Sequence, residues 1–116
     1  MKIQRFEDIL AWQRANELTV MIYTVFSESR DFGFRDQIQR ASVSVMNNIA
    51  EGFERKSNKE FRQFLFIAKG SCGEVRSMLI LGIELNKIDK ALGHQLQSKA
   101  EEISKMLSGF IKTLKV

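Results

Sequence analysis

Apolar residues recur along most of the chain at spacings of three and four positions, which places them on one face of an α-helix. The first such pattern covers residues 7–26, and the second covers residues 34–53. Two longer patterns follow over residues 57–85 and 89–114. The sequence therefore predicts four amphipathic helices, each with an apolar stripe that needs a packing partner.

Short polar segments separate the predicted helices. Residues 27–33, SESRDFG, interrupt the first pattern with small, charged and glycine residues. Ser57 followed by Glu60 is a capping box, and Asp89 is the expected N-cap of the last helix. Because the connections are short, consecutive helices are expected to pack side by side in opposite directions. The predicted fold class is all-α, with residues 1–116 forming a single antiparallel up-down four-helix bundle domain.

The second predicted helix carries a polar seam directly beside its main apolar stripe. A buried amide or hydroxyl group needs hydrogen-bond partners. We interpret the seam as a structural hydrogen-bond network that fixes the register of facing helices. The alternative is a shared polar pocket, or a site that lines the axis of an oligomer. The seam consists of Gln37, Arg40, Ser44, Asn48 and Glu51.

The third predicted helix places interior glycines on the side away from its core. Each interior glycine costs about 1 kcal/mol relative to alanine, so a compensating role is expected. Small residues flanked by large apolar ones let another helix approach closely, and the second helix has a matching weaker apolar strip. We predict a subunit interface, with a tight contact inside the monomer as the alternative. The candidate interface residues are Val43, Met46, Ala50, Phe53, Phe66, Gly70, Gly73, Ser77, Ile80 and Leu81.

Three cations recur every seven residues along the third predicted helix, with no acidic residue three or four positions away on that helix. Such a line can follow nucleic-acid phosphates. The alternative is a solvated face, or ion pairs with Glu17, Glu51 or Glu101 on neighbouring helices. No aromatic residues alternate with the cations, so base stacking is not predicted. The cations are Arg62, Lys69 and Arg76, and with Arg55, Lys56 and Lys59 at the preceding corner they are the candidate nucleic-acid-binding residues.

The composition fits a small helical domain and gives only mild support for nucleic-acid binding. Hydrophobic residues make up 44% and charged residues 28% of the 116 residues, and there is no proline. Proline is costly inside helices, so its absence suits long uninterrupted ones. The net charge of +4 is a mild basic bias, short of the strong asymmetry that would by itself require a nucleic-acid partner.

The sequence offers no catalytic constellation. Cys72 is the only cysteine and His94 the only histidine, which excludes an intramolecular disulfide and the usual metal sites. Glu101 and Glu102 are adjacent and point in different directions, so they do not form an acid/base pair. We therefore expect a protein that is not an enzyme and has no metal or cofactor. The absence of an apolar segment of membrane-spanning length, and a charged amphipathic N-terminal segment, lead us to expect a cytoplasmic protein without membrane partners.

Three segments of the chain resemble a known family. Residues 6–18, 37–55 and 60–75, the last containing FLFIAKGS, are similar to the signature blocks of the bacterial four-helix bundle proteins, also called 23S rRNA intervening-sequence proteins. The chain departs from the family pattern where Ser27 and Met46 stand near positions that usually hold proline. The resemblance implies a compact antiparallel bundle that assembles into a homopentamer, with an unresolved biochemical role.

The resemblance also suggests partners. Some family members are encoded inside insertions in 23S rRNA genes, and a related accessory protein of diversity-generating retroelements binds nucleic acid and a reverse transcriptase through a basic pentamer surface. Our leading hypothesis is a non-enzymatic homo-oligomer that binds RNA or DNA weakly through backbone contacts, with repeated copies adding avidity. The alternative is a protein-interaction scaffold that presents helices to a partner protein.

Overall fold

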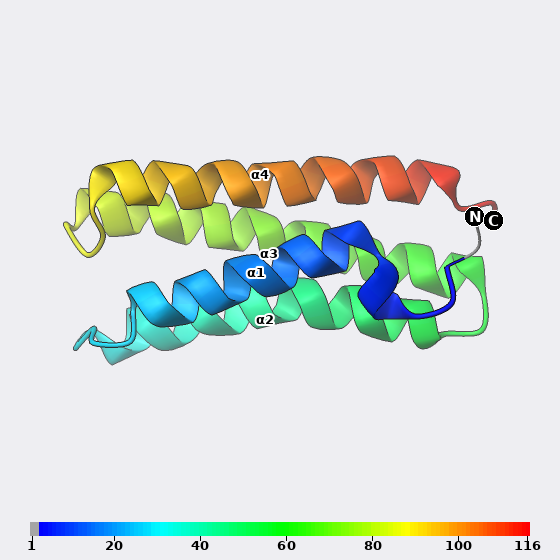
Figure 1. Cartoon of the computed structure of the whole chain (residues 1–116), viewed down its shortest axis with the longest axis horizontal. Coiled ribbons are helices and arrows are strands. Elements are labelled where there is room, and N and C mark those ends of the chain that lie inside the picture. Colours follow the sequence, from blue (N-terminus) through cyan, green and yellow to red (C-terminus); the bar gives the residue numbers. More distant parts are fainter. Residues whose placement is uncertain (1–2) are drawn as a thin grey trace.

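The structure, a computed structural model that describes residues 3–116, is an elongated bundle measuring 44 × 21 × 19 Å. The connections α1–α2 and α3–α4 lie at one end, and the α2–α3 connection lies at the other end with the carboxyl terminus (Figure 1). Every regular element within the described residues is helical. The elements are the 3-10 helix η1 (Phe6–Asp8) and the α-helices α1 (Leu10–Val25), α2 (Phe32–Glu54), α3 (Asn58–Glu84) and α4 (Lys90–Thr113).

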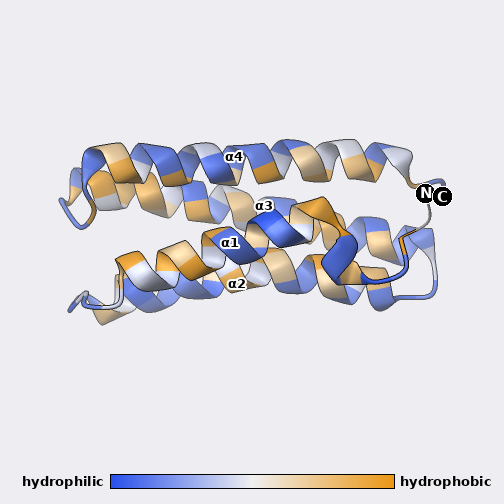
Figure 2. Ribbon diagram, in the orientation of Figure 1, coloured by the Kyte–Doolittle hydropathy of each residue, from blue (hydrophilic) through white to orange (hydrophobic). Residues whose placement is uncertain are grey.

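Each helix contributes an apolar stripe to one continuous core, and Figure 2 shows the alternation of polar and apolar positions along the ribbons. Leu65, Leu79 and Leu96 are fully buried, as are Ile38 on α2 and Ile22 on α1. Helix α1 packs more extensively against α2 than against α4, while α3 packs closely against both α2 and α4. The bundle is therefore centred on α3. None of the helices within residues 3–116 combines the length and the apolarity that crossing a membrane would require.

The first helix is shorter than the periodic pattern predicts. Ile9 has an extended backbone, with φ −76° and ψ 122°, and separates η1 from α1. The break turns the Ile9 side chain into the core, where it is 2% exposed. Two side chains of α1 hold η1 in place. Gln13 Nε2 donates to the Glu7 carbonyl oxygen at 2.9 Å, and Trp12 packs edge-on against Phe6. The prediction of one helix over residues 7–26 was therefore wrong at its amino-terminal end.

Side-chain caps set the starts of the other helices. The Asp89 carboxylate accepts hydrogen bonds from the amides of Ala91 and Leu92, which confirms the predicted N-cap of α4. At the start of α2, Asp31 Oδ1 accepts from the Phe34 amide at 3.1 Å. This cap starts α2 at Phe32, two residues earlier than the apolar pattern predicts.

Asp31 also joins the two connections at its end of the bundle. Its other carboxylate oxygen lies 2.9 Å from Lys87 Nζ, which follows α3. The Lys87 ammonium group, followed by the Phe34 amide, holds the pKa of the Asp31 carboxyl below its ordinary value. Because the pKa of Asp31 is lower in the folded than in the unfolded protein, the ionised carboxylate stabilises the fold. This stabilisation is complete at pH values above the pKa of Asp31 in the unfolded chain, and it is lost as the pH falls through the pKa in the folded protein.

Replacing Asp31 by asparagine should therefore flatten the pH dependence of stability in acid. Asparagine keeps an acceptor for the N-cap and removes the charge that Lys87 stabilises. Between about pH 2 and pH 5, the free energy of unfolding should rise less steeply with pH in Asp31→Asn than in the parent. Urea unfolding followed by circular dichroism across that range measures the slope. Lys87→Gln should flatten it in the same way, and parallel slopes in all three proteins would contradict the proposed ion pair.

Candidate nucleic-acid interface

The polar seam of α2 forms hydrogen bonds to α3. Ser44 Oγ lies 2.9 Å from Ser71 Oγ, and Asn48 Nδ2 donates to the Ser44 carbonyl oxygen at 2.8 Å and to Ser44 Oγ at 3.0 Å. Further along, Gln37 Nε2 donates to Glu74 Oε2 at 3.4 Å. The serines and Asn48 are partly buried, so their polar groups are satisfied where water has little access. This arrangement agrees with the structural interpretation of the seam.

Two of the predicted seam residues do not belong to this network. Glu51 forms an ion pair with Arg55 on its own helix, and Arg40 is exposed and makes no hydrogen bond to the seam within residues 3–116. Arg40 instead lines an open groove of about 600 Å³ together with Asp36 and Glu74. Both side chains are exposed to solvent. Their assignment to a buried network was therefore wrong.

Gly70 and Gly73 of α3 lie on a face that no other helix of the subunit covers. A Cβ atom added at Gly70 or Gly73 would meet no atom within 4 Å, so the alternative of a tight contact inside the monomer was wrong. Large apolar side chains flank the glycines, with Phe66 51% exposed and Ile80 47% exposed. We call this surface the outer α3 face, and it consists of Phe66, Ile67, Gly70, Gly73, Ser77, Ile80 and Leu81.

The apolar strip of α2 is partly used inside the subunit. Met46 and Phe53 pack against the core, and the Phe53 ring contacts Phe61 edge-on at 6.0 Å between centroids. Val43 and Ala50 remain half-buried without being part of the core cluster. Only part of the strip is thus free to contact another chain.

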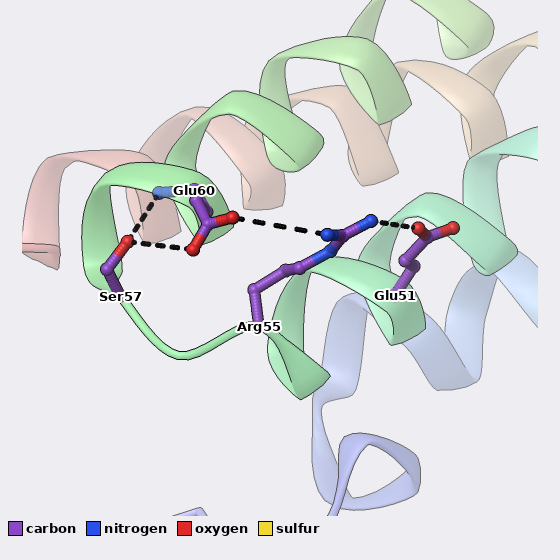
Figure 3. Close-up of polar contacts among 4 residues, drawn as sticks. All are labelled: Glu51, Arg55, Ser57 and Glu60. Carbon is purple, nitrogen blue, oxygen red and sulfur yellow. Dashed lines mark hydrogen bonds and ion pairs between the residues drawn. The ribbon is translucent and has the colours of Figure 1, made fainter.

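The corner between α2 and α3 is held by a chain of polar contacts (Figure 3). The Ser57 hydroxyl accepts from the Glu60 amide at 3.2 Å, which confirms Ser57 as the N-cap of α3. The Glu60 carboxylate accepts from the Ser57 hydroxyl, whereas a complete capping box has it accept from the Ser57 amide, so half of the predicted capping box is present. Arg55 lies between two carboxylates, pairing with Glu51 at 2.5 Å and approaching Glu60 at 4.0 Å. Its guanidinium group also lies 4.8 Å from the centroid of the Phe64 ring.

These contacts change which cations remain candidates. Two glutamates lie beside Arg55, so its positive charge is largely compensated inside the subunit. Arg76 Nη2 lies 4.0 Å from Glu101 on α4, so one of the predicted alternative ion pairs holds for this residue. Within residues 3–116, no ion pair engages the remaining four candidates. They are Lys56, Lys59, Arg62 and Lys69.

The fold adds two cations to this corner that the sequence pattern did not predict. Asn58 Nδ2 at the start of α3 donates to the Lys115 carbonyl oxygen at 3.0 Å, which fastens the chain after α4 beside the α2–α3 turn. Lys112 lies one turn earlier, in the last turn of α4. Among the acidic residues that flank the α2–α3 turn, Glu51 and Glu60 are both engaged by Arg55, and Glu54 is exposed at the end of α2. We call the resulting cluster the basic corner, and it consists of Lys56, Lys59, Arg62, Lys112 and Lys115.

The described residues offer little for nucleophilic or metal chemistry. Cys72 is fully buried, and its burial raises the pKa of the thiol to about 12. The thiol is therefore protonated at neutral pH and is not a nucleophile. In the part of the chain that the structure describes, no three His, Cys, Asp or Glu side chains gather closely enough to hold a metal ion.

Comparison with known proteins gives a consistent result. The family model described as "23S rRNA-intervening sequence protein" matches residues 7–109. The chain is similar to the crystal structure of a protein of unknown function from the S23 ribosomal protein family of Bacteroides thetaiotaomicron, with a TM-score of 0.83 and 27% sequence identity. That similarity covers 90% of this chain and 96% of the other. Among curated proteins, none matches the chain.

Proposed function

Because the chain belongs to the 23S rRNA-intervening sequence protein family, we propose that it is a non-enzymatic oligomeric bundle whose basic corner binds the phosphate backbone of RNA or DNA. The observation that carries the proposal is the group of cations at one end of the bundle that have no ion-pair partner within residues 3–116. The carboxylates of Glu51 and Glu60 beside the α2–α3 turn are already engaged by Arg55, so they compensate the neighbouring lysines little. Clustered Lys and Arg side chains of this kind supply non-specific, salt-sensitive affinity.

Assembly would turn a weak single contact into useful affinity. The outer α3 face is apolar, exposed and lined with glycines that have no neighbour inside the subunit, as a helix-to-helix contact between subunits requires. On the α1–α2 side, Val43 and the 45% exposed Tyr23 provide a second, different surface. A contact between two different surfaces repeats head to tail and can close into a ring. A homopentamer, which the family resemblance implies, is one such ring and would present five basic corners at once.

The proposal assumes an antiparallel up-down bundle. The alternation of the connections between the two ends supports this order (Figure 1). In such an order, the end of α4 and the beginning of α3 meet, which is what places Lys112 and Lys115 beside Lys56 and Lys59.

The salt dependence of binding tests the proposal. Fluorescence anisotropy with a labelled structured RNA should give an association constant that falls steeply with salt concentration, with little preference for sequence. In Lys56→Ala/Lys59→Ala, the slope of the logarithm of the association constant against the logarithm of the salt concentration should become shallower. The change should be about 0.7 to 0.9 for each phosphate that the variant no longer neutralises. The matched control is Arg30→Ala/Lys90→Ala, which removes two exposed cations at the far end of the bundle. A flat salt dependence, or equal reductions in both double variants, would contradict the proposal.

The alternative function is a scaffold that binds a partner protein, and the exposed apolar outer α3 face favours it. The same double variants separate the two functions. Loss of RNA binding in Lys56→Ala/Lys59→Ala is expected only if the basic corner contacts phosphates, whereas a protein partner on the outer α3 face would be retained.

A further inference from the structure

An aromatic pocket opens at the same end of the bundle as the basic corner. It has a volume of about 370 Å³, comparable with the smaller ligand-binding clefts of proteins. Its aromatic wall comes from three helices, with Phe53 of α2, Phe61 of α3 and Phe110 of α4, and Ile3 and Leu114 complete the apolar lining. These residues are far apart in sequence, so the pocket exists only in the folded chain.

The rings of the pocket are arranged to offer aromatic surface. Phe61 is 8% exposed and contacts Phe110 edge-on, with 5.3 Å between centroids and planes inclined at 71°. It contacts Phe53 in the same manner, at 82°. Phe53 and Phe110 are only half-buried, so part of each ring remains available to the pocket. A flat apolar group entering here would meet ring faces and edges on more than one side.

The mouth of the pocket is positively charged. Lys56 lines it together with Arg55, Ser57 and Asn58, and Lys59 is the second residue of α3. The Ser57 hydroxyl and the Asn58 amide are engaged in hydrogen bonds within the chain, whereas Lys56 has no ion pair within residues 3–116. The free polar group at the mouth is therefore a cation. A ligand that suits the site therefore has a flat apolar group, which enters the pocket, and an adjoining anionic group, which contacts Lys56.

We infer that the pocket binds one unstacked base of a single-stranded nucleic acid, while the adjoining phosphates contact Lys56 and Lys59. This inference rests on the proposed function and adds to it a preference for single strands. Stacking of a base on aromatic side chains does not depend on its identity, because every base presents a π-face. A duplex keeps its bases paired and would reach only the lysines. The structure thus brings together the aromatic and basic groups that the sequence order keeps apart.

Binding of matched strands with and without bases tests the inference. The probes are a fluorescein-labelled twelve-nucleotide oligothymidylate and a strand of equal length in which tetrahydrofuran abasic residues replace most thymidines. The parent protein should bind the strand with bases about tenfold more tightly, as expected from stacking. Phe110→Leu and Phe53→Leu should each remove most of that difference and leave the affinity for the abasic strand unchanged. Lys56→Ala/Lys59→Ala should weaken binding of both strands.

Controls distinguish failure of the pocket from failure of the basic corner. Phe32→Leu removes a 60% exposed phenylalanine at the far end of the bundle and should change neither affinity. If the parent binds both strands equally and with steep salt dependence, the pocket inference fails and the proposed function stands. If neither strand binds at low salt, the proposed function fails as well. A strand carrying 2-aminopurine provides a readout that needs no variant, since packing of the base against the phenylalanine rings that line the pocket should change its fluorescence, and an unchanged signal would overturn the inference.

Discussion

Replacing Gly52 by valine is expected to lower the free energy of unfolding by about 3 kcal/mol. Gly52 lies where α2 packs directly against the first turns of α3. A Cβ atom at this position would lie 2.7 Å from Phe64 Cβ and 2.9 Å from Phe61 Cδ1. The Phe64 Cβ atom is fixed by its backbone, so rotation of a side chain cannot relieve the overlap. The two helices would have to separate, which would open well-packed core beneath them.

Urea unfolding monitored by circular dichroism measures this loss. The matched control is Gly109→Val on α4, since a Cβ atom there would meet nothing within 4 Å. Its free energy of unfolding should stay within about 0.5 kcal/mol of the parent value, because valine has a slightly better helix propensity than glycine. Equal stabilities of the two variants would show that Gly52 does not mark a close helix contact.

Replacing Gly73 by glutamate is expected to dissociate the proposed oligomer while leaving the subunit folded. The position is exposed and free of neighbours inside the subunit, so the longer side chain fits the isolated bundle. Glutamate is also a better helix former than glycine by somewhat less than about 1 kcal/mol. In an interface built on the outer α3 face, however, it would bury a charge against apolar side chains such as Phe66 and Ile80. Assembly and subunit stability should therefore change in opposite directions.

Sedimentation velocity or light scattering gives the mass on which this prediction depends. The parent should sediment as an oligomer, Gly73→Glu as a folded monomer with an unchanged helical spectrum, and Gly109→Glu as an oligomer like the parent. A monomeric parent would refute self-assembly outright. An oligomeric Gly73→Glu protein would move the subunit contact away from the outer α3 face.

The helices were predictable because their signals are local. Spacing of apolar residues located all four, and the chemistry of Ser57 and Asp89 located two of their starts. The break at Ile9 was not predictable, since the apolar pattern continues across it and only burial of its side chain explains the extended backbone. Asp31, by contrast, precedes its helix as an N-cap residue usually does, and this signal was overlooked.

The candidate site was less predictable than the helices, because it depends on contacts between segments that are far apart in the sequence. The pairing of Glu51 with Arg55 could have been predicted, because the residues stand four positions apart with the acid first. The placement of Lys115 beside Asn58 could not, because 57 residues separate them and only the return of α4 brings them together. The same holds for the aromatic pocket, whose walls come from three helices. Sequence periodicity identifies which residues lie on the same face of a helix. It does not show which residues from different helices come together at the same end of the bundle.

The position of the basic corner at one end of the long axis has a consequence for any ring built from this chain. Both proposed contact surfaces lie along the sides of the bundle, so neighbouring copies would pack side by side with their long axes roughly parallel. Cyclic symmetry keeps every copy the same way up. All basic corners would then gather on one flat side of the ring and none on the other. Such a ring would have one basic flat side and one flat side without these cations. It would bind a polyanion across its basic flat side rather than around its outer rim.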